Sequence, residues 1–240
     1  MQGFLLAAAD GVARAVKGYK PSSSEQKLGA KVYNKASAQI DKLPAKVDLR
    51  PFMSRVENQQ QTSSCTANAT AGAYEYLMKR HQGSMKEVSR LYIYYNGRYV
   101  DDSENIEDEG LAISNAISGL KEYGACSEET WQFDPELVNQ EPEQQAYDEG
   151  AYYVIKGTRR VPVELDSWKT ALASGQPIIF GLALFDSFDK HQKPGLVPPP
   201  TSKEVTRASH AGHAMLCVGY SDPDKVFIVR NSWGEDWGDK

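Results

Sequence analysis

The sequence predicts an α+β protein in which a helical first part is followed by a strand-rich second part. Between residues 63 and 123, apolar residues recur at helical spacing, and after residue 150 short β-branched or aromatic runs are bounded by Gly, Pro and Asp. A chain of 240 residues, 40% of them hydrophobic, is long enough for one large domain or for two packed lobes. We therefore expect two lobes of different secondary structure.

The first 42 residues are predicted to be an appendage to the main domain. Residues 4–16 place Leu, Ala and Val at helical spacing, which predicts a short amphipathic helix. Pro21 and the serines that follow it predict a loop, and residues 25–43 are polar and basic without a strong period. The boundary lies near Pro44, so we expect an N-terminal extension over residues 1–42 and a main domain over residues 43–240.

The longest predicted helix follows Ser63 and Ser64, either of which can cap it. Its sequence is rich in Ala and ends near Lys79 and Arg80, whose positive charges suit a helix C-terminus. Because small side chains let another layer approach closely, we place this helix in the core between the two lobes. Further helices are predicted over residues 89–98, 111–123 and 166–173, the second of them stopped by Gly124.

Four strands are predicted in the second lobe, over residues 152–155, 177–184, 213–220 and 225–230. Residues 197–202 contain three consecutive prolines, which predict a rigid surface loop. In the strand at 213–220, His213, Met215 and Cys217 are expected to share one face, because side chains alternate along a strand.

Composition and charge exclude several classes of function. The formal net charge is −5, which argues against nonspecific nucleic-acid binding, and no apolar run is long enough to span a membrane. Three cysteines, Cys65, Cys126 and Cys217, cannot close a disulfide framework, and their spacing fits no zinc motif. We therefore expect no metal and no cofactor, while the compartment stays open.

The charge is unevenly spread along the chain. Residues 101–150 hold 15 acidic residues against Lys121, a net charge of −14, whereas residues 1–46 carry a net charge of +5. The two segments are expected to attract each other. The alternative is that the acidic segment only keeps a surface solvated.

Two segments far apart in the sequence supply the groups for acyl transfer by a cysteine nucleophile. Cys65 lies at the first turn of the longest predicted helix, where backbone N–H groups favour the reactive thiolate, and His213 can take the thiol proton to give a resting ion pair. Asn231 can accept a hydrogen bond from one imidazole nitrogen and fix the tautomer. Gln59 can donate to a developing oxyanion beside the backbone N–H of Cys65. These four residues are the candidate catalytic residues.

The sequence leaves two of these assignments open. Gln60 or Gln61 takes the place of Gln59 if the register of the loop differs, and His210 is an alternative to His213. Trp233, two positions after Asn231, can shield the bond between His213 and Asn231 from water.

Residues 56–65, 213–220 and 231–234 together resemble the papain and cathepsin family of cysteine peptidases, and the resemblance covers residues 43–240. It implies a papain-like fold with a helical left lobe, an antiparallel β-barrel-like right lobe and an active-site cleft between them. It also implies an endopeptidase that hydrolyses a peptide or protein substrate through an acyl-enzyme. The resemblance marks four substrate-binding residues: Gly110, Gly181, Ala214 and Trp233.

The sequence departs from the family pattern at three places. Thr62 replaces the cysteine that commonly bridges to a later loop, and Thr66 replaces the aromatic residue that commonly follows the nucleophile, as in some bacterial members. Residues 1–42 replace the long helical prodomain of cathepsins. We expect them to be a short propeptide that inhibits the enzyme in its zymogen form. The positive charge of this segment is expected to attract the acidic residues 101–150.

Two alternatives to the peptidase are kept. The same Cys/His pair serves acyltransferases and transamidases, which normally orient the histidine with an aspartate. A catalytically silent homologue that binds peptides is the other alternative.

Overall fold

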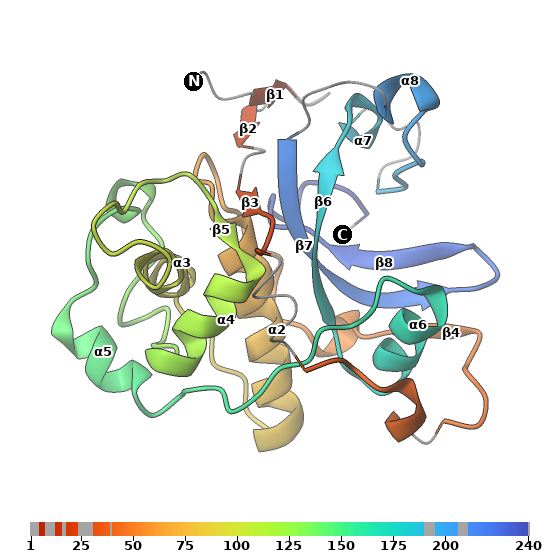
Figure 1. Cartoon of the computed structure of the whole chain (residues 1–240), viewed down its shortest axis with the longest axis horizontal. Coiled ribbons are helices and arrows are strands. Elements are labelled where there is room, and N and C mark those ends of the chain that lie inside the picture. Colours follow the sequence, from red (N-terminus) through yellow and green to blue (C-terminus); the bar gives the residue numbers. More distant parts are fainter. Residues whose placement is uncertain are drawn as a thin grey trace.

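The computed structural model of the chain describes residues 5–7, 13–15, 18–23, 31–38, 40–189, 195–205 and 211–239. Within these ranges, helices gather on one side of the molecule and an antiparallel sheet on the other (Figure 1). The predicted α+β architecture with two lobes is confirmed. No helix in the described ranges is both long and apolar enough to cross a bilayer.

The first lobe is built from helices. They are α2 (Cys65–Gln82), α3 (Arg90–Tyr99), α4 (Ile113–Glu122) and α5 (Gln144–Gly150), with a short 3-10 helix at Pro135–Leu137. Two further 3-10 helices lie elsewhere, Arg50–Phe52 against α2 and Lys35–Ala38 against α6. Helix α3 begins after Ser89, whose hydroxyl accepts a hydrogen bond from the backbone N–H of Tyr92 at 3.1 Å. Helix α2 ends at Gly83, whose φ of 75° suits a residue without Cβ. At the start of α2, Ser64 takes the N-cap position without a side-chain cap, so the predicted capping bond is absent.

The second lobe is a sheet organised around β7 (Ala211–Ser221). This strand pairs antiparallel with β4 (Lys46–Asp48), β6 (Ile178–Leu184) and β8 (Val226–Arg230). Helices α6 (Leu165–Ala173), α7 (Asp186–Asp189) and α8 (Ser202–Val205) complete this side of the molecule (Figure 1). Three of the four predicted strands and the helix predicted at 166–173 are confirmed with small shifts of their ends.

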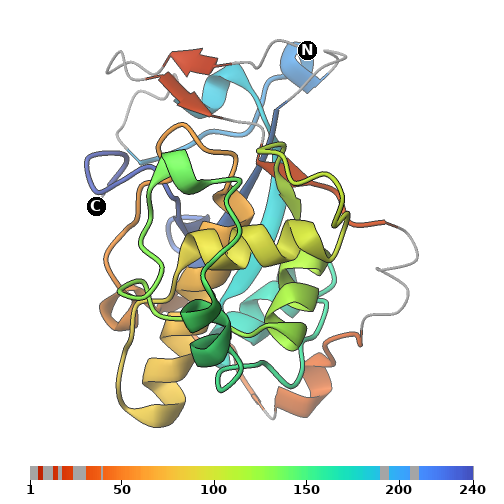
Figure 2. The same ribbon diagram turned by 90° about the vertical axis from the view of Figure 1, so that its left-hand side faces the viewer.

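Helix α2 lies between the lobes and contributes to both cores, as its composition predicts. Figure 2 views the helical lobe from outside, with the sheet behind it. The core shared with β6, β7 and α6 takes Ala69, Ala73 and Tyr76, and the core shared with α3 and α4 takes Ala67 and Ala71. A Cβ added at Gly72 would lie 3.2 Å from Nε of Arg230 and 3.5 Å from the Leu216 side chain. Small residues therefore let α2 and the sheet approach closely.

Within the range 4–16, where a helix is predicted, residues 5–7 and 13–15 are described and are not helical, and the rest of the range lies outside the described residues. Residues Leu5–Ala7 (β1) and Ala13–Ala15 (β2) are strands that pair antiparallel with each other. A helix of this length is marginally stable in water by itself, so pairing between two short strands competes with it. Further along, β3 (Tyr19–Lys20) pairs parallel with β5 (Leu111–Ala112) and lies between the two lobes (Figure 1).

The strand predicted at residues 152–155 is also wrong. This segment is irregular, and the side chain of Tyr152 is 85% exposed. Its backbone bonds to helices instead of a sheet, because the Tyr74 hydroxyl donates to the carbonyl of Tyr153 and the N–H of Ile155 donates to the carbonyl of Leu120. A β-branched and aromatic run needs a neighbouring strand to become one.

A buried carboxylate joins α2 to the second lobe. Glu75 is 3% exposed and accepts hydrogen bonds from the Ser54 hydroxyl at 2.5 Å and from the backbone N–H of Val88 at 2.9 Å. The guanidinium of Arg230, at the end of β8, donates to the hydroxyl and the carbonyl of Ser54. Burial outweighs these bonds and raises the pKa of Glu75 to about 6.

We predict that Glu75→Gln removes a pH-dependent loss of stability. Because burial raises the folded-state pKa of Glu75 from 4.5 to about 6, its contribution is fully present below pH 4.5 and is lost as the pH rises through 6. As the pH rises from 4 to 7, the free energy of unfolding of the variant minus that of the parent should increase by about 2 kcal/mol. Urea denaturation at several pH values measures this difference. The exposed control Glu141→Gln should follow the parent, and a Glu75→Gln curve parallel to the parent's would contradict the prediction.

Candidate active site

The sulfur of Cys65 lies where the two lobes meet. Cys65 is the first residue of α2 and is fully buried. Its Sγ accepts a hydrogen bond from the backbone N–H of Ala214 on β7 at 3.3 Å. Ala214 follows His213, so the two sequence segments that carry the predicted chemistry are side by side.

The imidazole of His213 is oriented by Asn231, as predicted. The distance between Nε2 of His213 and Oδ1 of Asn231 is 2.7 Å. The backbone N–H of Ser232 donates to the same Oδ1 at 2.8 Å, which identifies that atom as the amide oxygen. The His213 Nε2 therefore carries the proton, and Nδ1 has the free lone pair of a base. This Nδ1 is buried and has no hydrogen-bond partner among the described residues.

Trp233 covers the imidazole. Its indole ring stacks on His213 with 5.0 Å between ring centroids and 30° between planes. The indole is 3% exposed and packs edge-on against Phe188 and Trp237. The predicted shielding role fits this geometry, while substrate contact by Trp233 stays a prediction.

Among the three consecutive glutamines, Gln59 is the buried one. Gln60 and Gln61 are exposed, and Gln60 has a positive φ of 52° that turns the chain. The Oε1 of Gln59 accepts from the Ser232 hydroxyl at 2.6 Å, and its Nε2 donates to the carbonyl of Thr62 at 2.8 Å. The second amide hydrogen stays available to donate, and the side chain is fixed beside the residue that follows Asn231.

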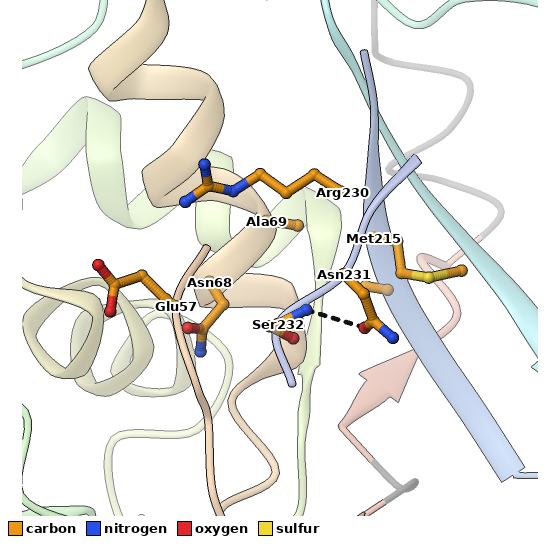
Figure 3. A pocket seen from close by; sticks show the side chains of 8 residues that line it. Glu57, Asn68, Ala69, Met215, Arg230, Asn231 and Ser232 are labelled. Carbon is orange, nitrogen blue, oxygen red and sulfur yellow. Dashed lines mark hydrogen bonds between the residues drawn. The ribbon is translucent and has the colours of Figure 1, made fainter. Parts of the chain in front are cut away.

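A small cavity of about 10 Å³ lies behind these residues, between α2 and the start of the Asn231 loop (Figure 3). It is lined by Glu57, Asn68, Ala69, Ala214, Met215, Arg230, Asn231 and Ser232. Such a volume is close to that of one water, so it cannot hold a substrate. The cleft that takes the substrate lies elsewhere, over the sulfur.

The N-terminal segment occupies that cleft. Gly18 is buried, and a Cβ added to it would lie 2.4 Å from the Sγ of Cys65 and 2.4 Å from the carbonyl oxygen of Ser63. Its own carbonyl accepts a hydrogen bond from the backbone N–H of Leu111 at 2.9 Å. Only a residue without a side chain fits over the sulfur.

Tyr19 fills the next part of the cleft. A Cβ at Gly181 would lie 2.3 Å from its ring, and a Cβ at Gly212 would lie 2.6 Å from its carbonyl oxygen. Gly181 and Gly212 therefore lie against this tyrosine, whereas a role of Ala214 in substrate binding stays a prediction, and Gly110 does not pair with the segment. Leu111 does, and the N–H of Gly110 is donated to the Tyr94 hydroxyl at 3.0 Å. Pairing of a substrate with Gly110 stays a prediction.

Burial of Cys65 and His213 disfavours the expected charged forms. Desolvation raises the pKa of the Cys65 thiol to about 12 and lowers the pKa of the His213 imidazole to about 4. Burial therefore favours a neutral thiol and a neutral imidazole over the thiolate–imidazolium pair expected from the sequence. The covered cleft favours the uncharged forms because water no longer solvates either group.

Sequence reasoning missed Gly18 and Tyr19 as parts of the site. A glycine before a tyrosine in a basic segment carries no signal of its own, and only its position over Cys65 reveals a role. The alternative histidine, His210, lies outside the described residues.

The model of the papain family of cysteine proteases matches residues 43–240. The chain belongs to this family. A papain-family chain of this kind is a cysteine-type peptidase, and the membership does not favour the acyltransferase or the silent homologue.

Individual relatives of the peptidase agree. An uncharacterized peptidase C1-like protein of Acanthamoeba polyphaga mimivirus is 37% identical over 223 residues, which cover 88% of this chain and 70% of that protein. Cathepsin K of Gallus gallus is 28% identical, and the match spans 82% of this chain but only 57% of the cathepsin. The crystal structure of xylellain, a cysteine protease from Xylella fastidiosa, is 30% identical, with a TM-score of 0.82 over 99% of this chain and 89% of xylellain. A digestive procathepsin of Tenebrio molitor shares the fold at a TM-score of 0.68 over 84% of this chain and 64% of that chain, with 22% identity.

We predict that the three thiols of the folded chain react slowly with iodoacetamide at pH 8. All three cysteines are free and buried, and burial raises the pKa of each to about 12. Only about one thiol in ten thousand is then ionised, and the thiolate is the reactive form. Peptide mass spectrometry after short labelling measures the modified fraction at each cysteine, with urea-unfolded protein as the fully reactive reference. Rapid labelling of Cys65 alone would show that the segment does not cover the sulfur.

Proposed function

We propose that this peptidase uses Cys65 as nucleophile and His213 as base, and that residues 18–23 hold it latent by filling the cleft. The observation that carries the proposal is the position of Gly18, against the sulfur and between the two lobes. The reaction proposed is endopeptidase cleavage of an extended peptide that takes the place of this segment.

The proposed chemistry follows from the hydrogen bonds at His213. With the Nε2 proton held by Asn231, the lone pair of Nδ1 takes the thiol proton as sulfur attacks the peptide carbonyl. The imidazolium then gives this proton to the leaving amine, and a water molecule hydrolyses the acyl-enzyme with the imidazole again as base.

Gln59 is proposed as the oxyanion donor. Its carbonyl oxygen is committed to Ser232 and one amide hydrogen to Thr62, so the remaining hydrogen has a fixed direction. The second donor proposed is the backbone N–H of Cys65, at the positive end of α2. Fixed donors of this kind contribute about 3 to 4 kcal/mol each in comparable sites.

Displacement of the segment is the proposed route to activity. Once water and substrate replace Gly18, the desolvation that favours the neutral pair falls, and the charged pair becomes accessible. The expected attraction between the basic N-terminus and the acidic residues contributes only modestly, since Lys20 and Glu109 are exposed and 3.9 Å apart. Steric fit and backbone hydrogen bonds contribute most to keeping residues 18–23 in the cleft.

Replacement of Cys65 tests the assignment of the nucleophile. In the Gly18→Ala background, Cys65→Ala should abolish cleavage of a fluorogenic peptide, because the thiol that forms the acyl-enzyme is removed, whereas Cys126→Ala should retain it. Product analysis with and without an added amine separates a peptidase from an acyltransferase. Equal cleavage by the Gly18→Ala variant with and without Cys65→Ala would refute the assignment.

Replacement of Gly18 tests whether residues 18–23 keep the enzyme latent. Gly18→Ala should raise the rate of peptide cleavage by about tenfold or more, because its Cβ would meet the sulfur and the Ser63 carbonyl at 2.4 Å and expel the segment. Gly157→Ala is the matched control, since a Cβ there meets nothing within 4 Å. Initial rates are compared at equal concentrations of folded protein. Equal rates for Gly18→Ala and Gly157→Ala would rule out inhibition by this segment.

A further inference from the structure

We propose that Asp108 is a positioning residue for this peptidase. Its carboxylate joins the nucleophile loop, residues 59–65, to the peptide ledge, Gly110 and Leu111, across which an extended peptide lies. The inference rests on the proposed function and adds to it the residue that sets the width of the cleft.

One oxygen of the Asp108 carboxylate bonds to the nucleophile loop directly and to the peptide ledge through Tyr94. Oδ1 of Asp108 accepts from the backbone N–H of Ser63 at 2.8 Å and from the Tyr94 hydroxyl at 2.7 Å. The Tyr94 hydroxyl in turn accepts from the backbone N–H of Gly110 at 3.0 Å. Because the hydroxyl gives its only proton to a carboxylate, its oxygen becomes a better acceptor for Gly110.

Tyr94, through which Asp108 reaches Gly110, is held in place on α3. Tyr94 is fully buried on α3, and the guanidinium of Arg98, one turn further along, lies 3.9 Å from the centre of its ring. Arg98 also donates to the carbonyl of Glu107 at 2.8 Å. Helix α3 thus fixes residues 107–110, and Asp108 extends this hold to the loop before Cys65.

A peptide in the cleft touches both parts. Gly18 accepts from the N–H of Leu111 while its Cα lies against the Ser63 carbonyl and the sulfur. The spacing between ledge and loop therefore sets how close a bound carbonyl comes to the nucleophile. All three cysteines are free, so no disulfide fixes this spacing. Thr66 also ties α2 to the ledge, through a hydrogen bond from Oγ1 to the carbonyl of Leu111 at 2.8 Å, and Asp108 adds the hold on Ser63.

Four variants separate positioning from folding. Asp108→Ala should lower kcat/KM by about tenfold, through both kcat and KM, because a displacement of about 1 Å at a reacting centre has large effects on rate. Asp108→Asn should recover most of this loss, since its Oδ1 can still accept both bonds. Tyr94→Phe loosens only the ledge and should raise KM with kcat nearly unchanged. Glu104→Ala, which removes an exposed acid from the same loop, should match the parent.

The kinetics are measured on the full chain and in the Gly18→Ala background, with thermal unfolding to check that each variant folds. Amide hydrogen exchange gives a readout without activity. Exchange at Ser63 and Gly110 should accelerate in Asp108→Ala and not in Glu104→Ala, and Tyr94→Phe should accelerate Gly110 alone.

A tenfold loss of kcat/KM together with faster exchange supports the proposal. Unchanged kcat/KM in Asp108→Ala overturns it, whatever the exchange, and unchanged exchange at both amides overturns it as well. If Cys65→Ala in the Gly18→Ala background cleaves as well as Gly18→Ala alone, the proposed function fails, whereas exchange still reports on the connection.

Discussion

The site depends on the close approach of the first turn of α2 to β7. The hydrogen bond from the backbone N–H of Ala214 to the sulfur of Cys65 is possible only because small residues line the interface behind it. Gly72 and the alanines of α2 let the helix lie against the sheet, and Glu75 and Arg230 hold the two lobes together further along. A larger side chain in this interface would separate a thiol and an imidazole that lie on different lobes.

The charge state of the pair is decided by what covers it. Desolvation dominates at both Cys65 and His213 and moves their pKa values in opposite directions, each toward the neutral form. Gly18 lies against the sulfur, so the segment contributes to the burial that disfavours the reactive ions. In the function proposed here, latency and activation are therefore linked through solvation.

The loops that carry the site are held mainly by bonds from other elements. The backbone N–H of Gln59 donates to the carbonyl of Ser232 at 2.8 Å, and the Ser232 hydroxyl returns a bond to the Gln59 side chain. Arg90 of α3 donates to the carbonyl of Asn58 at 3.3 Å. The position of each functional group thus depends on its neighbours across the cleft, which explains why residues without chemistry of their own matter here.

The sequence by itself determined the α+β class, helix α2 and three strands, because periodicity and turn residues are local signals. It also identified Cys65, His213, Asn231 and Gln59 as candidates, because their chemistry and joint motifs are readable without coordinates. Local patterns failed at residues 4–16 and 152–155, where pairing partners decide between helix, strand and irregular chain. Only the tertiary structure selected Gln59 from three glutamines, by burial, and placed Gly18 over the sulfur. It alone revealed the burial that favours the neutral thiol and imidazole, since desolvation depends on which segments pack around a group and not on the group's neighbours along the chain.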